Sequence, residues 1–186
     1  IQRSGTLDAA AASGKRVEQR AESLAALNEK VGEVYWAMEF DADDTAPTPV
    51  APTLEPVANE YRTRASVTVD CSCPSDASVS AGERLERAIG YLVSDALVDD
   101  TADQEVTLTA EAVADGIEIR VASPDGHITD TERELLEGGT EITQLNHSRD
   151  IDLWVAQWIV DAYGGTFRID EDAPGSCVAI RLPRPR

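Results

Sequence analysis

The sequence predicts an α/β fold in which helices cover one face of a mixed β-sheet, preceded by one long helix. Two observations carry this prediction. From residue 54 onward, segments with alternating apolar residues are interspersed with segments whose apolar residues recur every three or four positions. Before residue 40, apolar residues recur every seven positions. We therefore expect a dimerisation or linker helix in residues 1–40, a Pro-rich hinge in 41–53 and one α/β domain in 54–186.

The first helix is expected to span residues 14–40. Val17, Leu24, Val31 and Met38 lie seven residues apart and form a narrow apolar seam, which is typical of a helix that packs on another helix. The sequence favours a homodimer formed through this helix, and the alternative is a helix that lies on its own domain. Three prolines and an acidic cluster in residues 41–53 then argue against both helix and strand.

The α/β domain shows clear element boundaries. Ser80 and Glu83 have the spacing of a capping box, so we expect a helix to begin there. Asp115-Gly116 predicts a hairpin turn, and Gly164-Gly165 predicts the end of a helix. The expected order is helix 54–61, strand 66–73, helix 80–96, strands 105–113 and 116–122, helix 131–137, loop 140–150, helix 151–163, and strands 166–170 and 176–182.

The composition limits the possible partners. Among 186 residues, 35 are acidic and 16 are Lys or Arg, which gives a net charge of −19 and argues against nucleic acid and anionic membranes. No apolar run is long enough to span a bilayer. Three cysteines do not make a secreted disulfide framework, so we expect a cytoplasmic location.

Acidity combined with very few lysines also carries information about the source. Lys15 and Lys30 are the chain's lysines and aromatics make up 5%, a composition that resembles proteins of salt-loving archaea. The alternative is an ordinary acidic protein from an organism living at low salt. Because the first residue is Ile1, we expect the chain to be a fragment of a longer protein.

Three segments resemble the catalytic domain of sensor histidine kinases, a GHKL-type ATPase domain. They are the run Leu153-Trp-Val-Ala-Gln-Trp-Ile-Val-Asp-Ala-Tyr-Gly-Gly165, the helix 85–96, and the stretch Val121-Ala-Ser-Pro-Asp-Gly-His-Ile128. The resemblance implies a Bergerat-like two-layer sandwich, a site for ATP and Mg²⁺, and a role in two-component phosphorelay signalling. A response regulator or a kinase is then the implied partner. A phosphoacceptor histidine is not evident in this chain. Its two histidines, His127 and His147, both lie within the predicted catalytic domain.

The positions that the resemblance assigns to ATP depart from the family's pattern. Ser123 stands where the family has the Asp that binds the adenine amino group, and a neutral hydroxyl is a weaker acceptor. Asp125 and His127 stand at two glycine positions. Asp95 replaces the family's Mg²⁺-binding Asn and can be interpreted either as a weak Mg²⁺ ligand or as one more surface carboxylate.

The phosphate-binding loop departs furthest. Asp150 and Asp152 occupy glycine positions, where their carboxylates would cap the helix and repel a triphosphate. Like unit charges 4 Å apart cost about 4 kcal/mol at an effective dielectric of about 20. We therefore predict a signalling module with a degenerate nucleotide site, no catalytic residue and no bound cofactor. One alternative is an active, ATP- and Mg²⁺-dependent histidine kinase with variant motifs, and another is a purely structural dimerisation module.

Overall fold

The computed structural model describes residues 32, 45–64, 66–97, 103–129, 133, 136, 148–170, 173 and 175–185, with the side chains of 148–151 left out. The chain divides into two units, Ile1–Glu39 and Phe40–Arg186. The predicted helix 14–40 lies outside the described residues, apart from Gly32, which is helical. None of the described helices combines the length and the apolar character that crossing a bilayer requires.

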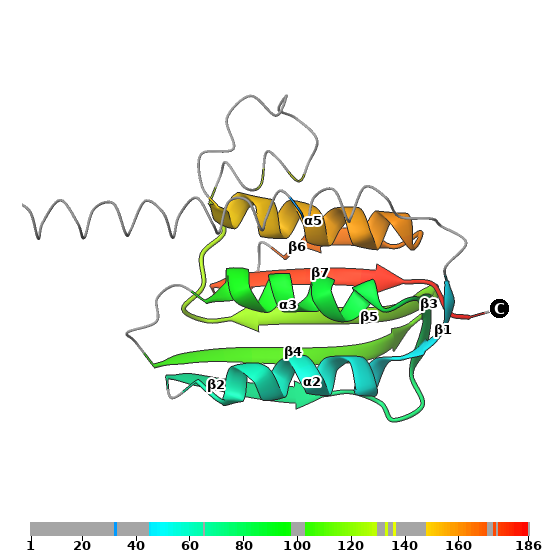
Figure 1. The fold of residues 1–186 in the computed structure, drawn as a ribbon, viewed down its shortest axis with the longest axis horizontal. Helices are drawn as coiled ribbons and strands as arrows, with labels where there is room; N and C mark the ends of the chain where they lie inside the picture. The colour runs from blue at the N-terminus through cyan, green and yellow to red at the C-terminus, as the bar shows by residue number, and fades with distance from the viewer. Residues whose placement is uncertain are drawn as a thin grey trace, which may run out of the picture. The chain divides into compact units, whose positions relative to one another are not determined.

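The second unit contains a mixed five-stranded sheet with the strand order β2-β4-β5-β7-β6 (Figure 1). β2 (Val67–Ser72) runs parallel to β4 (Gln104–Val113), whereas the other neighbours pair antiparallel. The remaining strands are β5 (Gly116–Ser123), β7 (Ser176–Leu182) and the short edge strand β6 (Thr166–Ile169). The predicted mixed sheet and both predicted hairpins are confirmed.

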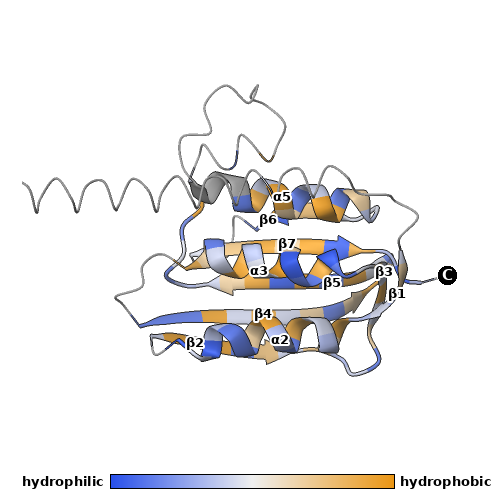
Figure 2. Cartoon of the chain, in the orientation of Figure 1, coloured by the Kyte–Doolittle hydropathy of each residue, from blue (hydrophilic) through white to orange (hydrophobic). Residues whose placement is uncertain are grey.

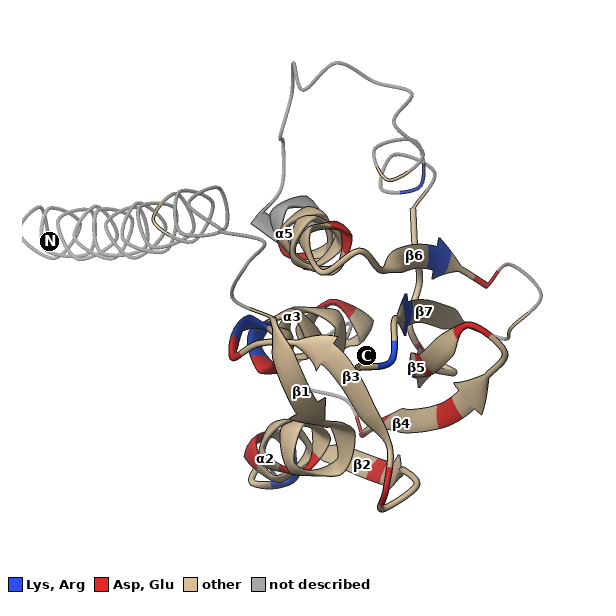
Figure 3. Cartoon of the chain, turned by 90° about the vertical axis from the view of Figure 1, so that its right-hand side faces the viewer, with Lys and Arg blue, Asp and Glu red and all other residues tan. Residues whose placement is uncertain are grey.

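Three helices cover one face of this sheet, as the end-on view in Figure 3 shows. They are α2 (Val50–Arg62), α3 (Arg84–Ala96) and α5 (Ser148–Ala162). Figure 2 shows hydrophobic residues on both the helices and the strands. The buried ones form the core, where each fully buried Leu or Ile contributes about 1.5–3 kcal/mol. Fully buried members of this core are Leu54, Leu85, Ile89, Leu92, Leu108, Ile119, Leu153, Ile159, Ile180 and Leu182.

α5 ends just before Gly164-Gly165, the glycine pair from which the sequence predicted a helix end. Gly164 adopts a φ of 68°, and the Gly165 amide donates to the Val160 carbonyl at 2.9 Å. This pattern satisfies carbonyl groups that the helix end would otherwise leave without donors. The chain can then turn back directly into β6.

Two predictions about local structure are wrong. Residues 46–53 are not irregular, because β1 (Ala46–Pro49) pairs with β3 (Ser78–Ala81) and α2 begins at Val50. Pro47 and Pro49 are tolerated because β1 belongs to a two-stranded sheet. Pro52 is tolerated because the N–H groups in the first turn of a helix make no bond within that helix. Ser80 therefore lies in a strand, and α3 has Glu83 as N-cap with no side-chain capping bond.

The segment before α5 was predicted as a loop from 140 to 150. The helix in fact begins at Ser148, which places Asp150 in its first turn. Residues 140–147 lie outside the described residues. The predicted helix 131–137 also falls largely outside them, although Arg133 and Leu136 are helical.

Candidate functional site

The candidate site lies where the end of β5 meets the start of β7 and the C-terminal end of α3. Ser123, the last residue of β5, is paired across the sheet with Ser176, the first residue of β7. Both side chains are on the helix-covered side of the sheet, because they continue the buried rows of Val121 and Val178. The site therefore lies on the helix-covered face of the sheet and not on its bare face.

The two serine hydroxyls at this corner are buried and unpaired. Ser123 has no exposed surface and Ser176 is 4% exposed, and neither Oγ has a hydrogen-bond partner among the described residues. An unpaired buried hydroxyl is unusual, since it loses its bonds to water without gaining new ones. These two oxygens thus hold unused capacity to donate and accept hydrogen bonds.

The turn that follows β5 is held tightly against the same corner. The Gly126 amide donates to the Ser123 carbonyl at 3.2 Å. A Cβ at Gly126 would overlap Ser176 Oγ and would lie 2.8 Å from Ser176 Cβ and 3.0 Å from the Ala96 carbonyl oxygen. Glycine is thus needed at position 126 because Ser176 and Ala96 leave no room for a Cβ. It is not needed for positive φ, since the φ of Gly126 lies outside the left-handed region.

A second glycine closes the corner from the side of β7. Gly175 adopts a φ of 76°, and a Cβ there would overlap the Ser123 carbonyl oxygen and lie 2.5 Å from the Pro124 carbonyl oxygen. Only glycine fits both requirements at low energy. The two glycines together fix the distance between the β5 turn and the start of β7.

The other predicted site residues are divided between surface and interior. Asp125 and His127 are exposed, whereas Asp95 near the end of α3 and Asp152 in the first half of α5 are each 8% exposed. Burial raises the pKa of Tyr61 on α2, and the negative charge of Asp152 adds to that rise. The side chain of Asp150 lies outside the described part of the structure.

A metal site with three or more protein ligands is not assembled by the side chains that can be described. Among them, no group of three or more His, Cys, Asp or Glu residues is placed to hold a metal ion. Mg²⁺ commonly takes one or two carboxylates together with substrate phosphates. Among the described side chains, Asp95 is the one that the resemblance assigns to such a site.

The described residues of this corner suit the parts of a nucleoside triphosphate unequally. The paired hydroxyls of Ser123 and Ser176 are suited to a neutral polar group such as an amine or amide. Asp95 on α3 and Asp152 on α5 are instead buried carboxyl groups on the two helices beside this corner, and each of them already has an interaction partner within the fold. The two hydroxyls thus offer hydrogen bonds to a small polar group but no charge to neutralise a phosphate.

Sequence reasoning placed Ser123, Asp125 and His127 in one segment but missed Ser176. The structure joins Ser176 to Ser123 through strand pairing, a contact across 53 positions that no local pattern reveals. A weak signal was present, since Ser176 follows a Gly at the start of a predicted strand, as the family's closing hairpin would require. The sequence likewise did not predict that the Ala96 carbonyl oxygen lies close to Gly126, because this depends on where α3 ends.

Comparison with known sequences gives one sensor protein as a relative. No protein-family model matches the chain. The C4-dicarboxylate transport sensor protein DctB of Rhizobium meliloti is 27% identical over 178 residues, which is 88% of this chain. The chain spans about 28% of the length of that relative.

Solved structures similar to this one are histidine kinases. The catalytic domain of histidine kinase ThkA gives a TM-score of 0.63 at 14% identity, over 75% of this chain and 95% of that domain. Acinetobacter baumannii histidine kinase AdeS gives 0.66 at 16% identity, covering 92% and 84% of the two chains. Full-length ShkA in complex with AMPPNP gives 0.68 at 18% identity, covering 88% of this chain and 37% of that one. The fold of the chain is therefore that of histidine kinase catalytic domains, as the resemblance predicted.

Proposed function

We propose that this chain is a signal-transduction module built on the histidine kinase ATP-binding fold, with a degenerate nucleotide site. Its role is to transmit a conformational signal or to hold a partner, as a pseudokinase does. The proposal places it in a two-component system, in the cytoplasm, with a response regulator or a true kinase as partner. The chain would pair with a second copy through residues 14–40.

One observation carries the proposal. Ser123 stands at the position where the family's adenine-binding carboxylate is expected, and it offers a neutral hydroxyl that is fully buried beside Ser176. A neutral acceptor gives up roughly half of the strength of a charge-assisted hydrogen bond. Burial of both oxygens further means that a ligand has to displace packed groups before it reaches them.

The charges around this corner support the same conclusion. Asp125 is exposed beside it, Asp152 is buried in α5, and Asp150 lies in the first turn of that helix. Amide groups at a helix N-terminus attract anions, but nearby carboxylates compete for them and repel phosphate. The net charge of −19 adds a long-range repulsion toward ATP, which is weakened but not reversed by salt.

A second candidate is an active, ATP-dependent histidine kinase with variant motifs. The observation that favours it is the unused hydrogen-bonding capacity of Ser123 and Ser176, which an incoming amino group could use. Asp95 would then serve as a single Mg²⁺ ligand. In this candidate the two acidic residues Asp150 and Asp152 still stand at the predicted phosphate-binding positions, so we rank it second.

Calorimetric titration of the full chain with ATP and Mg²⁺ in high salt separates the two candidates. The degenerate site predicts no binding in the micromolar range, whereas a micromolar Kd would overturn the proposal. Replacing the two acidic residues in the N-terminal half of α5, as Asp150→Gly with Asp152→Gly, is expected to increase ATP affinity. The matched control is Asp161→Gly near the exposed end of the same helix, which should leave affinity unchanged.

A further inference from the structure

Two free thiols lie close together at one edge of the sheet. Cys71 is near the end of β2, the edge strand, and Cys73 follows directly after that strand. Both side chains are half-buried, whereas Ser72 between them is exposed and Val69, two positions before Cys71, is buried. Side chains two positions apart point to the same face of a strand, so both thiols belong to the row of Val69 on the helix-covered face.

The neighbours of this pair come from α2 and from the pair itself. Arg62 of α2 lies against β2, where its Nε donates to the Val69 carbonyl at 2.9 Å, and its charge is paired with Glu55 at 3.2 Å. Burial raises the pKa of both thiols, and the charge of a Cys71 thiolate raises the pKa of Cys73 further. The two sulfur atoms are therefore within electrostatic reach of each other, and a cation between them would interact with both.

The spacing of the two residues suits a bridging metal ion better than a disulfide. Residues two positions apart along a strand are separated by about 6.6 Å. A disulfide needs Cβ atoms about 3.5–4.5 Å apart, so these thiols cannot join directly without movement of the backbone. Two metal–sulfur bonds of about 2.3 Å placed end to end span about 4.6 Å, a distance that the sulfur atoms reach when the two Cβ–Sγ bonds tilt toward each other.

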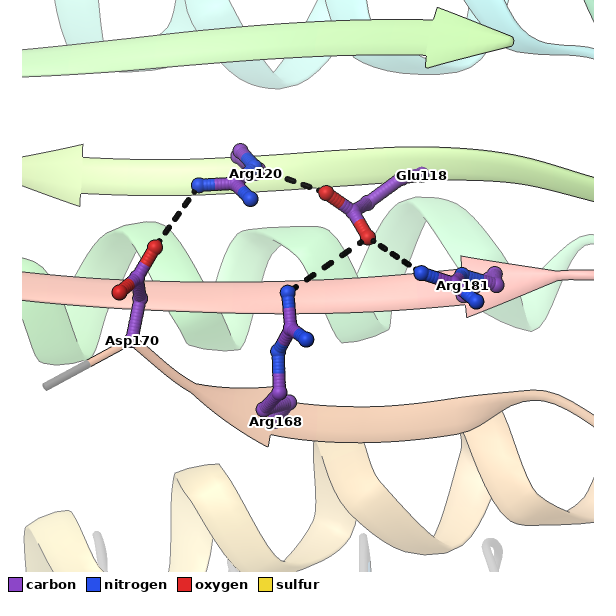
Figure 4. Close-up of polar contacts among 5 residues, drawn as sticks. All are labelled: Glu118, Arg120, Arg168, Asp170 and Arg181. Atoms are coloured by element: carbon purple, nitrogen blue, oxygen red, sulfur yellow. Dashed lines mark hydrogen bonds and ion pairs between the residues drawn. The ribbon is translucent and has the colours of Figure 1, made fainter. Parts of the chain in front are cut away.

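The third cysteine of the chain does not belong to this pair. Strand pairing places Cys177 of β7 in one row with Asp70 of β2, which precedes Cys71 and so points to the opposite face of the sheet. Cys177 is buried there beside Arg120, which donates to Glu118 at 2.8 Å in the ion-pair cluster of the bare face (Figure 4). Any ion held by the thiols of the β2 edge is therefore held by two cysteines and not by three.

Two thiolates without further protein ligands select one class of metal. Among the described residues, no group of three or more His, Cys, Asp or Glu is placed to hold a metal ion. These residues thus do not build the four-ligand site that structural Zn²⁺ takes. Cu⁺ is a soft ion that prefers thiolates and is stable with two of them in a line.

We propose that Cys71 and Cys73 form a two-thiolate site for Cu⁺ at the edge of the sheet. On binding, both S–H bonds break, two protons leave to the solvent and two Cu–S bonds form, while copper and sulfur keep their oxidation states. The weak hydrogen bond from Cys73 Sγ to the Pro74 carbonyl, at 3.3 Å on the surface, is given up. The net charge of −19 attracts cations to the chain.

This site does not depend on the proposed function. β4 lies between β2 and β5, the strand that carries the serine corner. Binding of Cu⁺ at the edge and binding of nucleotide at the corner are therefore separate properties, and each can be measured without the other.

The test titrates the full chain, reduced and free of oxygen, with Cu⁺ supplied as its coloured bicinchoninate complex. We expect the chain to remove one Cu⁺ per molecule from the dye, and Zn²⁺ at the same concentration not to compete. Cys71→Ser and Cys73→Ser should each weaken binding at least about 100-fold, since even groups that only orient metal ligands contribute about 10–100-fold. The matched control is Cys177→Ala on the opposite face, which should leave the affinity unchanged.

X-ray absorption at the copper edge examines the parent chain directly and does not depend on whether a cysteine variant folds. Two sulfur ligands, with no nitrogen or oxygen ligand, are expected, and any other ligand set contradicts the proposal. Circular dichroism identifies the variants that are folded.

Several further results would overturn the proposal. Failure of the parent chain to take Cu⁺ from the dye would remove the site. Unchanged binding after Cys71→Ser with Cys73→Ser, or an equal loss in a folded Cys177→Ala variant, would assign the metal to other residues. One Cu⁺ per two chains would place the ion between copies of the chain, and Zn²⁺ binding as tight as that of Cu⁺ would require ligands beyond the two thiols.

Discussion

Replacing Gly126 by Ala tests the packing of the serine corner. The new Cβ would overlap Ser176 Oγ and lie 2.8 Å from Ser176 Cβ and 3.0 Å from the Ala96 carbonyl oxygen. Two of these three atoms are backbone or Cβ atoms, which cannot rotate away. Overpacking of a close-packed region costs about 1–3 kcal/mol, so we expect a loss of stability of this size. For a domain of this length, each kcal/mol shifts Tm by about 2–4 °C.

A second glycine offers a matched comparison. A Cβ at Gly90, within α3, would meet no atom within 4 Å. Gly90→Ala should therefore increase stability by about 0.5–1 kcal/mol, because Ala is favoured over Gly inside a helix. Urea unfolding of both variants gives the two free energies directly. The expected difference between them is about 1.5–4 kcal/mol, with opposite signs relative to the parent chain.

A double-mutant cycle isolates the contact itself. Ser176→Gly removes the two nearest atoms that the new Cβ meets and leaves the Ala96 carbonyl oxygen at 3.0 Å. The penalty of Gly126→Ala should then fall by about 0.5–3 kcal/mol, the range of coupling energies between contacting residues. Our reasoning fails if Gly126→Ala is as stable as Gly90→Ala, or if Ser176→Gly leaves its cost unchanged.

Three further predictions concern other parts of the chain. Ser123→Ala and Ser176→Ala should be neutral or stabilising by up to about 1 kcal/mol, since each removes an unpaired buried hydroxyl; a loss above about 1 kcal/mol in urea unfolding would reveal a hydrogen bond. The pKa of Glu118 is lowered in the folded state, so its contribution to stability is complete above its usual value of 4.5 and is lost as pH falls through the folded pKa. Melting curves between pH 3 and pH 6 should hence show a steeper acid loss for the parent than for Glu118→Gln, and parallel curves would contradict this. Val31→Asp should convert a dimer into a monomer in sedimentation, whereas an unchanged mass would exclude the apolar seam of residues 14–40 as an interface.

Local patterns in the sequence determined much of the architecture. The alternation in β4 and β5 and the wide apolar stripe of α3 each reflect the side-chain period of one element. The same applies to the glycine pair after α5, because a helix end needs a residue that accepts positive φ. Such signals are contained within a few neighbouring residues, so they can be interpreted before the fold is known.

Other local signals were misleading because tertiary contacts overrode them. The spacing of Ser80 and Glu83 fits a capping box, yet Ser80 pairs with Pro47 in a strand and its amide donates to the Pro183 carbonyl at 2.8 Å. The prolines of residues 46–53 suggested a hinge, but an edge strand and a first helical turn both accept them. Each of these outcomes depends on a partner strand far away in the sequence.

The sequence by itself determined the order of α2, β2, α3, β4, β5, α5, β6 and β7, but not β1 and β3. It also determined the acidic character of the chain and which residues stand at the positions that the resemblance assigns to ATP. Only the tertiary structure paired Ser123 with Ser176, revealed that Gly126 is needed for space, and gathered Arg120, Arg168 and Arg181 around Glu118. The physical reason is that strand pairing brings together residues tens of positions apart, and the free energy of a buried hydroxyl or a shared carboxylate is set by those neighbours.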